Sequence, residues 1–478
     1  MGKSWISRGI TILGSLLLAV LVLAVGALVV LGIPRNAAGM AAKGICSAAF
    51  VAGRPLDNLM AQEVLPASPV LGAIGISVDK ASQTVTARFA GLFARQARLL
   101  PDRGCVLDVD LDPSSAALEP DTRLVADPGR PWPQGEAPLP VAEWGAGVDA
   151  KALQQLVQQA FVGAGDPRAA NARGVAIVHK GRMLVLYTAP GFDLFTPLHG
   201  WSMSKTVLGM LSYKLAADTG LSFDTPVVDA FAKPREPAWV ATWRGDARKA
   251  IKVSDLMFMR DGLASTEDYD PWGSVPRMLW GRADAPGFAA ASKPEAAPGE
   301  RWRYLSATAN LMAAVDRARF AKDADYWAYP ARALFEPIGA TTAVLETDSA
   351  GNWVGSSYLW ASVGDWARFG QLMLSDGRWE GRQILPPGWL KLASTRATAQ
   401  GEGRGYGAMT WRIGDPDEGE CKAYGLPADT IAMTGHWGQI VAMVPSRDAV
   451  IVRLGWTFRV NQFDECAFVA AALKALPH

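Results

Sequence analysis

Two segments of the chain show the hydrophobic pattern of a β-hairpin. Residues 174–187, GVAIVHKGRMLVLY, form two apolar runs separated by a Lys-Gly dipeptide that is typical of a tight turn. Near the C-terminus, residues 440–444 and 449–454 are again apolar, and the sequence Pro-Ser-Arg-Asp separates them. We therefore expect paired strands at two places that lie far apart in the sequence.

The part between the two hairpins has a helical pattern. In residues 206–217 and 365–374, apolar residues recur every three or four positions, which predicts helices that bury one face. A helical middle between two strand-rich ends favours one antiparallel sheet that is built from N- and C-terminal strands. The predicted fold class is therefore α+β, an antiparallel sheet with flanking helices and a helical insertion.

The N-terminal segment, residues 9–34, carries no charge. It is dominated by Leu, Val, Ile and Ala, and about 20 such residues cross the ~30 Å core of a bilayer. A cleaved signal peptide is the alternative, although its apolar region usually has only about 7 to 15 residues. Lys3 and Arg8 precede the segment, which places residues 1–8 in the cytoplasm by the positive-inside rule. The prediction is a transmembrane anchor or signal, a single pass through the cytoplasmic (inner) membrane, and a periplasmic or extracellular catalytic domain.

The remainder of the chain divides into two expected parts. Residues 35–145 show few helical periods and end in the Pro-rich sequence DPGRPWPQGEAPLP, which predicts a linker or a strap on the main domain. Residues 146–478 have the pattern of one compact enzyme domain. Disulfides are natural outside the cytoplasm, and the sequence leaves three pairings open. The cysteines are Cys46, Cys105, Cys421 and Cys466.

Composition excludes some classes of protein. A chain of 478 residues that is 50% hydrophobic can bury a large core. Its 47 basic and 46 acidic residues give a net charge of +1, and without a Lys/Arg-rich block we expect no nucleic-acid partner. The four histidines are scattered along the sequence, so we predict neither a metal site nor a cofactor. The oligomeric state is left open.

Candidate chemistry begins with Ser202 and Lys205, three residues apart at the start of a helical pattern. Positions i and i+3 share one helix face, so the lysine can take the proton of the serine hydroxyl if burial lowers its pKa. A second copy of the spacing, Ser77 to Lys80, precedes a β-prone stretch rather than an apolar helix. We therefore place the nucleophile at Ser202.

The motifs that follow resemble those of the class C β-lactamase and penicillin-binding-protein superfamily, especially the 6-aminohexanoate-dimer hydrolase branch. Their order along residues 174–454 is the order in that family, and the combination is more specific than any single motif. They are GWSMSKT at 200–206, LMFMRDGL at 256–263, YLS at 304–306, ASVGDWARFGQLML at 361–374, YGAMTW at 406–411 and TGHWGQ at 434–439.

The resemblance implies a role for each matching residue. Ser202 would be the nucleophile that forms an acyl-enzyme, and Lys205 its general base. Tyr304 would carry protons to the leaving group and from the deacylating water. Tyr269, in the sequence EDYDPW, resembles a substrate-contacting loop tyrosine, and the aromatic residues Trp201, Tyr269, Trp272 and Trp437 are expected near the pocket.

Two motifs depart from the β-lactamase pattern. His436 and Gly438 belong to a His-Trp-Gly sequence that stands where β-lactamases have Lys-Thr-Gly, so a mostly neutral imidazole replaces the cation that would bind a drug carboxylate. The backbone N–H of Gln439 would still complete an oxyanion hole with that of Ser202. Ser306 stands where many relatives have Asn, and we expect it to hydrogen-bond to the lysine or the substrate.

The sequence thus favours a hydrolase that cleaves a small ester or amide through a serine acyl-enzyme. One alternative is a D-alanyl-D-alanine carboxypeptidase or a true β-lactamase, which the loss of the Lys-Thr-Gly lysine argues against. The other is a binding or sensor protein that has the fold without turnover, which the intact trio of Ser202, Lys205 and Tyr304 argues against. The natural substrate is left open.

Overall fold

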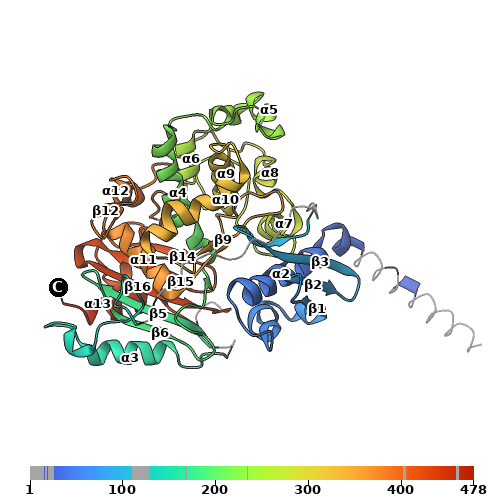
Figure 1. Ribbon diagram of the computed structural model, residues 1–478. Helices are drawn as coiled ribbons and strands as arrows, with labels where there is room; N and C mark the ends of the chain where they lie inside the picture. Colours follow the sequence, from blue (N-terminus) through green and yellow to red (C-terminus); the bar gives the residue numbers. More distant parts are fainter. Residues whose placement is uncertain are drawn as a thin grey trace, which may run out of the picture.

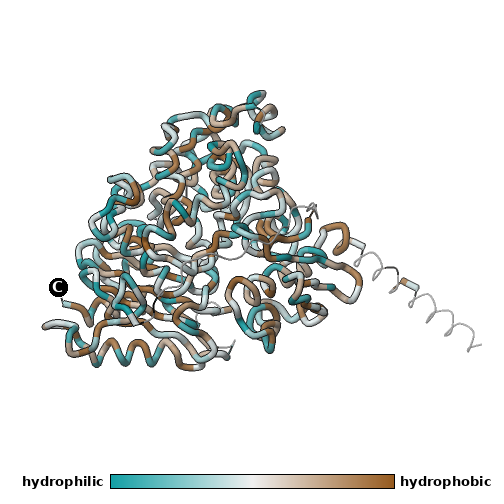
Figure 2. Tube along the Cα trace, in the orientation of Figure 1, coloured by the Kyte–Doolittle hydropathy of each residue, from teal (hydrophilic) through white to brown (hydrophobic). Residues whose placement is uncertain are grey.

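The computed structural model describes residues 15–16, 19, 26–109, 127, 129–166, 169–233, 235–401, 405–458 and 462–477. Figure 1 shows a sheet with helices on both faces, a helical part beside it, and a smaller N-terminal part in blue. Apolar stretches run through all of these parts (Figure 2).

The largest sheet has five antiparallel strands in the order β14-β15-β16-β5-β6. Both predicted hairpins belong to it, and β16 from the C-terminal hairpin pairs with β5 from the N-terminal one. The predicted α+β class, with one sheet assembled from distant strands, is confirmed. The strands are β5 (Ala172–His179), β6 (Arg182–Thr188), β14 (Ile431–Gly435), β15 (Gln439–Val444) and β16 (Ala449–Gly455).

Both faces of this sheet are buried, because side chains alternate between two hydrophobic clusters. One face packs on α11 (Val363–Leu374), where Gly370 allows close approach: a Cβ there would lie 2.5 Å from a methyl group of Val450. The other face packs on α3 (Ala150–Ala160) and α13 (Glu465–Lys474). Buried residues toward α11 include Ala176, Val178, Val441, Met443, Val450 and Val452, and those on the other face include Val175, Ile177, Ile440, Ala442 and Ile451.

The helical part lies between strands β6 and β14 in the sequence. Its longest helix is α4 (Ser204–Thr219), which starts just after the predicted nucleophile and packs on α9 (Ser306–Arg317). The other helices are α5 (Ala238–Arg244), α6 (Val253–Met257), α7 (Ser274–Gly281), α8 (Ala285–Ala290), α10 (Asp323–Pro330) and α12 (Trp389–Ser394). Short strands β7 (Leu198–His199), β9 (Val344–Leu345) and β10 (Leu359–Ala361) form a small sheet, and β8 (Arg301–Trp302), β11 (Arg378–Trp379), β12 (Arg382–Gln383) and β13 (Gln400–Gly401) pair in twos.

The N-terminal part is more regular than its sequence predicts. Helix α2 (Ile33–Cys46) packs on an antiparallel meander, β1 (Ile74–Asp79), β2 (Thr84–Phe89), β3 (Phe93–Leu100) and β4 (Gly104–Leu107). A buried ion pair, Lys43 with Glu346 at 3.1 Å, joins this part to the rest. Ser47 donates to the same carboxylate at 2.8 Å. The two parts therefore share one interior.

Two disulfides form, which selects one of the three possible pairings. Cys46 of α2 is bonded to Cys105 of β4, so the bond holds the helix against its meander. Cys421 is bonded to Cys466 of α13, which ties a surface segment to the C-terminal helix.

The Pro-rich strap lies along α11. Arg368 of α11 donates to the carbonyl oxygens of Pro133 at 3.0 Å and Gly135 at 2.8 Å, and it pairs with Glu136 at 2.5 Å. Both side chains of this ion pair are buried. The strap is thus fixed by a charge pair that its proline content alone does not predict.

The predicted transmembrane helix over residues 9–34 is corrected by the structure. Within the part of the chain that the structure describes, no helix is long and apolar enough to cross a membrane; most of residues 9–25 lie outside that part. Helical structure is interrupted at Gly32, whose φ is 73°, and α2 then packs Ala38 and Ala41 into the N-terminal core. The predicted single-pass inner-membrane location and membrane partner depended on that helix and are withdrawn with it.

Candidate active site

Ser202 lies in a single 3₁₀ turn, Trp201–Met203, directly before α4. The turn is fixed to β10, because the N–H of Gly200 donates to the carbonyl of Leu359 and the N–H of Leu359 donates to Ser204 Oγ, both at 2.9 Å. Trp201 has a φ of 49°, a left-handed conformation that costs energy for a bulky residue. The surrounding contacts hold this strained turn and present the hydroxyl of a half-buried Ser202 at the helix start.

Lys205 is fully buried beneath Ser202. Its Nζ donates to Ser202 Oγ at 2.9 Å, to Ser306 Oγ at 3.0 Å and to the carbonyl oxygen of Ser356 at 3.0 Å. Burial lowers the pKa of Lys205 to about 8, and the negative charge of Glu267 opposes that decrease. All three hydrogen-bond partners are neutral, so the ammonium group can release its proton near neutral pH.

Tyr304 lies on the other side of the same hydroxyl. It is hydrogen-bonded to Ser202 and to Trp411, and its ring lies 4.7 Å from Lys205 Nζ. Burial raises the pKa of Tyr304 far above its usual value, and the charge of Glu267 adds to the increase. The phenol therefore stays protonated and can pass a proton on by giving one and taking another.

Glu267 is a member of this cluster that sequence reasoning missed. Its two carboxylate oxygens accept hydrogen bonds from the N–H and the Oγ of Ser306, both at 2.6 Å. Ser306 Oγ in turn accepts from Lys205, so Ser306 connects the carboxylate to the lysine. In the sequence, Glu267 stands out only as an acidic residue two positions before Tyr269. Nothing in the sequence pairs it with Ser306, which lies 39 residues away.

The turn between β14 and β15 packs against the 3₁₀ turn Trp201–Met203 that holds Ser202. Gly435 makes the approach possible, since a Cβ there would lie 2.3 Å from the carbonyl oxygen of Gly200. Gly438 has a φ of 81°, which a residue with a side chain rarely adopts. The side chain of Gln439 points away from Ser202: it donates to the carbonyl of Gly455 at 2.5 Å and accepts from the N–H of the same residue at 2.9 Å. The oxyanion-hole role predicted for Gln439 concerns its backbone N–H, and the side chain takes no part in it.

His436 and Tyr269 form one aromatic wall. Their rings are stacked, with centroids 4.6 Å apart and planes 6° from parallel, and Trp201 meets His436 edge-on at 5.3 Å. Burial lowers the pKa of His436 to about 4, so the imidazole is neutral at physiological pH. Trp437 packs on Trp201 at 5.0 Å, whereas Trp272 is 55% exposed. Three of the four predicted pocket aromatics are thus brought together.

His199 packs against the turn Trp201–Met203 that holds Ser202. It was not predicted from the sequence as a site residue. Its ring stacks on Trp201 at 4.3 Å and on Trp360 at 4.6 Å, and its Nε2 donates to the carbonyl of Ser357 at 2.7 Å. Burial lowers its pKa to about 3, so this histidine is a neutral packing group.

Other sequence candidates lie elsewhere. Ser77 belongs to strand β1 and pairs with Thr86, so the second Ser-x-x-Lys copy has no helical geometry. Among the described residues, no group of three or more His, Cys, Asp or Glu is arranged to hold a metal ion.

Comparison with known proteins agrees with this geometry. The sequence matches the family model described as Beta-lactamase over residues 150–475, while no curated protein matches it. Solved structures share the fold. A protein described as a 6-aminohexanoate-dimer hydrolase from Bacillus anthracis has a TM-score of 0.50 and 17% identity, covering 68% of this chain and 83% of its own.

Two further structures align over nearly their whole length. A penicillin-binding protein homologue from Caulobacter crescentus has a TM-score of 0.50 and 18% identity, and the hydrolase EstCE1, described as having promiscuous acyltransferase activity, has 0.52 and 16%. Each alignment covers 68% of this chain and 97% of the other. At such identities they show a common fold, and the family match spans more than half of this chain. The predicted superfamily is confirmed: the chain belongs to the β-lactamase family, whose members are serine hydrolases.

Proposed function

We propose that the protein hydrolyses a small, uncharged ester or amide through an acyl-enzyme on Ser202. The observation that carries the proposal is the buried Lys205, which donates to Ser202 Oγ at 2.9 Å and has a pKa lowered to about 8. About one such lysine in ten is neutral at pH 7 and can accept the serine proton.

Acylation follows from the positions of the three side chains. Ser202 Oγ attacks the substrate carbonyl carbon while its proton moves to Lys205 Nζ. The negative charge that forms on the carbonyl oxygen would be bound by the backbone N–H groups of Ser202 and Gln439. As the bond to the leaving group breaks, Tyr304 donates its proton to the leaving oxygen or nitrogen and is reprotonated from Lys205.

Deacylation reverses the proton path with water as the nucleophile. A water molecule attacks the acyl carbon, and its proton passes through Tyr304 toward Lys205. Collapse of the intermediate releases the carboxylic acid and returns the proton to Ser202 Oγ. Glu267 and Ser306 act as positioning residues, because they fix Lys205 through the 3.0 Å bond to Ser306 and moderate its pKa.

The charge of the pocket supports an uncharged substrate. The position of the β-lactamase Lys-Thr-Gly lysine is held by His436, whose pKa near 4 leaves it neutral, and its ring is stacked on Tyr269. This wall offers aromatic surface rather than a cation, so apolar or aromatic groups bind better than a carboxylate.

A second candidate is a β-lactamase or a D-alanyl-D-alanine carboxypeptidase, which the family match and the penicillin-binding-protein fold favour. Hydrolysis of a chromogenic cephalosporin at a rate comparable to that of a neutral ester would select it. We expect the ester to be preferred, and His436→Lys to raise the relative rate on the cephalosporin.

The test of the proposed function is labelling with a fluorophosphonate probe, read by intact-protein mass, beside a p-nitrophenyl butyrate assay. Wild type should be labelled and active. Ser202→Ala should lose the label and reduce turnover by about 10⁴-fold or more while remaining folded by circular dichroism. Ser77→Ala, in the second Ser-x-x-Lys copy, is the matched control and should behave as wild type.

The outcomes separate the alternatives. Labelling without turnover would favour the sensor protein, and a folded protein that shows neither would leave only the fold in common with the family. Loss of label in Ser77→Ala would move the nucleophile out of the pocket and overturn the proposal.

A further inference from the structure

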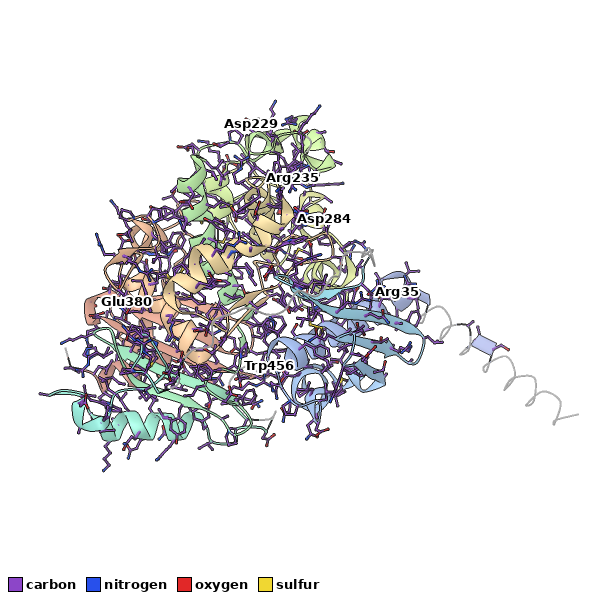
Figure 3. The ribbon with its side chains drawn as sticks, viewed as in Figure 1. Arg35, Asp229, Arg235, Asp284, Glu380 and Trp456 are labelled. Atoms are coloured by element: carbon purple, nitrogen blue, oxygen red, sulfur yellow. A yellow bond between two sulfur atoms is a disulfide. The ribbon has the colours of Figure 1, made fainter. Side chains whose placement is uncertain are left out.

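Four arginines line one cavity at the junction of the N-terminal part with the helical part. The cavity has a volume of 320 Å³, and its lining also includes Asn36, Gly281 and the apolar segment Val29, Val30, Leu31 and Gly32. The arginines come from three different elements: Arg35 from α2, Arg95 from β3, and Arg277 and Arg282 from α7 and its C-terminal end. Figure 1 shows α7 beside this part of the chain, and Figure 3 labels Arg35 at its edge.

The junction that holds these arginines is closely packed. Two glycines allow α2 and α7 to touch: a Cβ on Gly281 would lie 2.5 Å from Asn36 Oδ1, and a Cβ on Gly39 would lie 2.8 Å from the carbonyl oxygen of Trp280. The disulfide between Cys46 and Cys105 fixes α2 against the meander. The guanidinium groups are thus carried by backbones with fixed relative positions.

The charge of the cavity is not compensated by the residues described around it. None of its lining residues is acidic, and none of the four arginines forms a salt bridge with another described residue. Within the described ranges, Arg282 donates only to the carbonyl oxygen of Gly281, at 3.2 Å, and the buried Nε of Arg95 has no hydrogen-bond partner. Asp108 interacts with Arg95 electrostatically without a salt bridge. Four like charges around one cavity repel each other, and a bound anion would reduce this repulsion.

A second cavity adjoins the first and shares Arg277 and Arg282 with it. It has a volume of 710 Å³ and is lined mainly by small and hydroxyl-bearing residues and by Phe288. Its one acidic lining residue, Asp284, is engaged in capping α8 and accepts from Asn352 at 3.2 Å. The first cavity can hold an anionic group, and the second has room for the body of the same molecule.

We propose that this pair of cavities is a binding site for a phosphate-bearing ligand, with the phosphate group held by the four arginines. Guanidinium groups bind phosphate oxygens in pairs through charge-assisted hydrogen bonds, which makes arginine the residue best suited to this anion. Neither cavity is lined by Ser202, Lys205, Tyr304 or Ser306, and the proposal does not depend on the proposed hydrolysis. The phosphate group can belong to a soluble phosphate ester or to a lipid headgroup.

The test is a calorimetric titration with pyrophosphate. It is done at physiological ionic strength, so that non-specific attraction between the anion and surface charges is screened. Wild type should bind saturably. The double variant Arg277→Gln/Arg282→Gln should bind about tenfold or more weakly, because two charge-assisted contacts are lost. Both side chains are exposed, so the variant should keep the fold and its ester hydrolysis. Arg182→Gln, at an exposed site in β6, is the matched control and should bind as wild type.

Sedimentation with vesicles separates the two sources of phosphate. If the double variant reduces binding to phosphatidylglycerol vesicles and leaves binding to phosphatidylcholine vesicles unchanged, the ligand is a headgroup. If it weakens pyrophosphate binding alone, the ligand is a soluble phosphate ester. Absence of saturable pyrophosphate binding together with unchanged vesicle binding, or an equal loss in Arg182→Gln, overturns the proposal.

Discussion

Two fully buried lysines lie in different surroundings in this molecule. Lys43, at the junction with the N-terminal part, pairs with Glu346 at 3.1 Å and donates to the carbonyl of Cys105 at 2.6 Å. Lys205, under Ser202, has only hydroxyl and carbonyl hydrogen-bond partners among the residues that the structure describes. Each ammonium also lies over a tyrosine ring, at 4.2 Å from Tyr358 and 4.7 Å from Tyr304.

The two lysines differ in how close a carboxylate lies to the ammonium group. Burial lowers the pKa of both lysines, and at Lys43 the direct contact with Glu346 opposes the decrease. At Lys205 the nearest carboxylate, Glu267, acts through Ser306 and opposes it less directly. A buried lysine with a touching carboxylate is a structural cation, whereas one held by neutral groups can exchange its proton.

The largest effect should come from Lys205→Met. We expect turnover of p-nitrophenyl butyrate to fall on the order of 10⁴-fold, because the serine loses its base. The fold should be retained, since the change removes a buried charge rather than adding one. Steady-state kinetics with circular dichroism measures both. Activity within tenfold of wild type would show that another group takes the proton.

Lys43→Met should reduce stability and leave catalytic turnover nearly unchanged, the reverse of Lys205→Met. Glu346 would be left buried without its cation, which costs about 3–5 kcal/mol of unfolding free energy, while turnover per folded molecule changes little. Urea denaturation with the disulfides intact measures the loss. The double variant Lys43→Met/Glu346→Gln should recover part of it, and if the double variant is no more stable than the single one, the ion pair is not the source of the effect.

Glu267→Gln should have a smaller effect, on the pH profile. Glu267 raises the pKa of Lys205 against the effect of burial, so its loss should move the rise of kcat/KM with pH from about 8 to a lower value. Turnover should fall about tenfold as Ser306 loses its alignment. Asp268→Asn, which removes a neighbouring charge, is the control. If the pH profile of kcat/KM does not shift in Glu267→Gln, Glu267 has a purely structural role.

The smallest expected effect is on how the free energy of unfolding changes with pH, through the protonation of Lys205. The pKa of Lys205 is about 8 in the folded protein and 10.5 in its ordinary state, so the unfolded chain binds more protons between these values and stability rises with pH there. Below about pH 8 the cost of the buried charge is complete. Lys205→Met should therefore be more stable than wild type near neutral pH, with a gain that shrinks toward pH 10.5 in denaturation measurements. A gain that does not change with pH would point to packing instead.

Local pattern predicted much of the fold. The hairpins at 174–187 and 440–454 correspond to β5-β6 and β15-β16, and the helical patterns at 206–217 and 365–374 lie within α4 and α11. These succeed because side-chain periodicity is a property of a few neighbouring residues. The transmembrane prediction over residues 9–34 is not supported, because within the described part of the chain no helix is long and apolar enough and helical structure is interrupted at Gly32.

The site was predicted in part. Ser202, Lys205, Tyr304 and Ser306 are brought together as expected. The side chain of Gln439 turns into the hairpin, while the prediction concerned only its backbone N–H. Their catalytic roles remain proposals. Glu267 was missed because its partner is distant in sequence and the hydrogen bonds exist only after the loop folds against α9.

The sequence by itself placed Lys205 next to Ser202, since two residues three positions apart at the start of a helix lie close together whatever surrounds them. It also determined the strand and helix segments and the family. Only the tertiary structure decided the disulfide pairing, the Lys43–Glu346 and Arg368–Glu136 pairs, and the arginine-lined cavity. These contacts join residues that are tens to hundreds of positions apart, so their geometry follows from how whole elements pack and not from any local pattern.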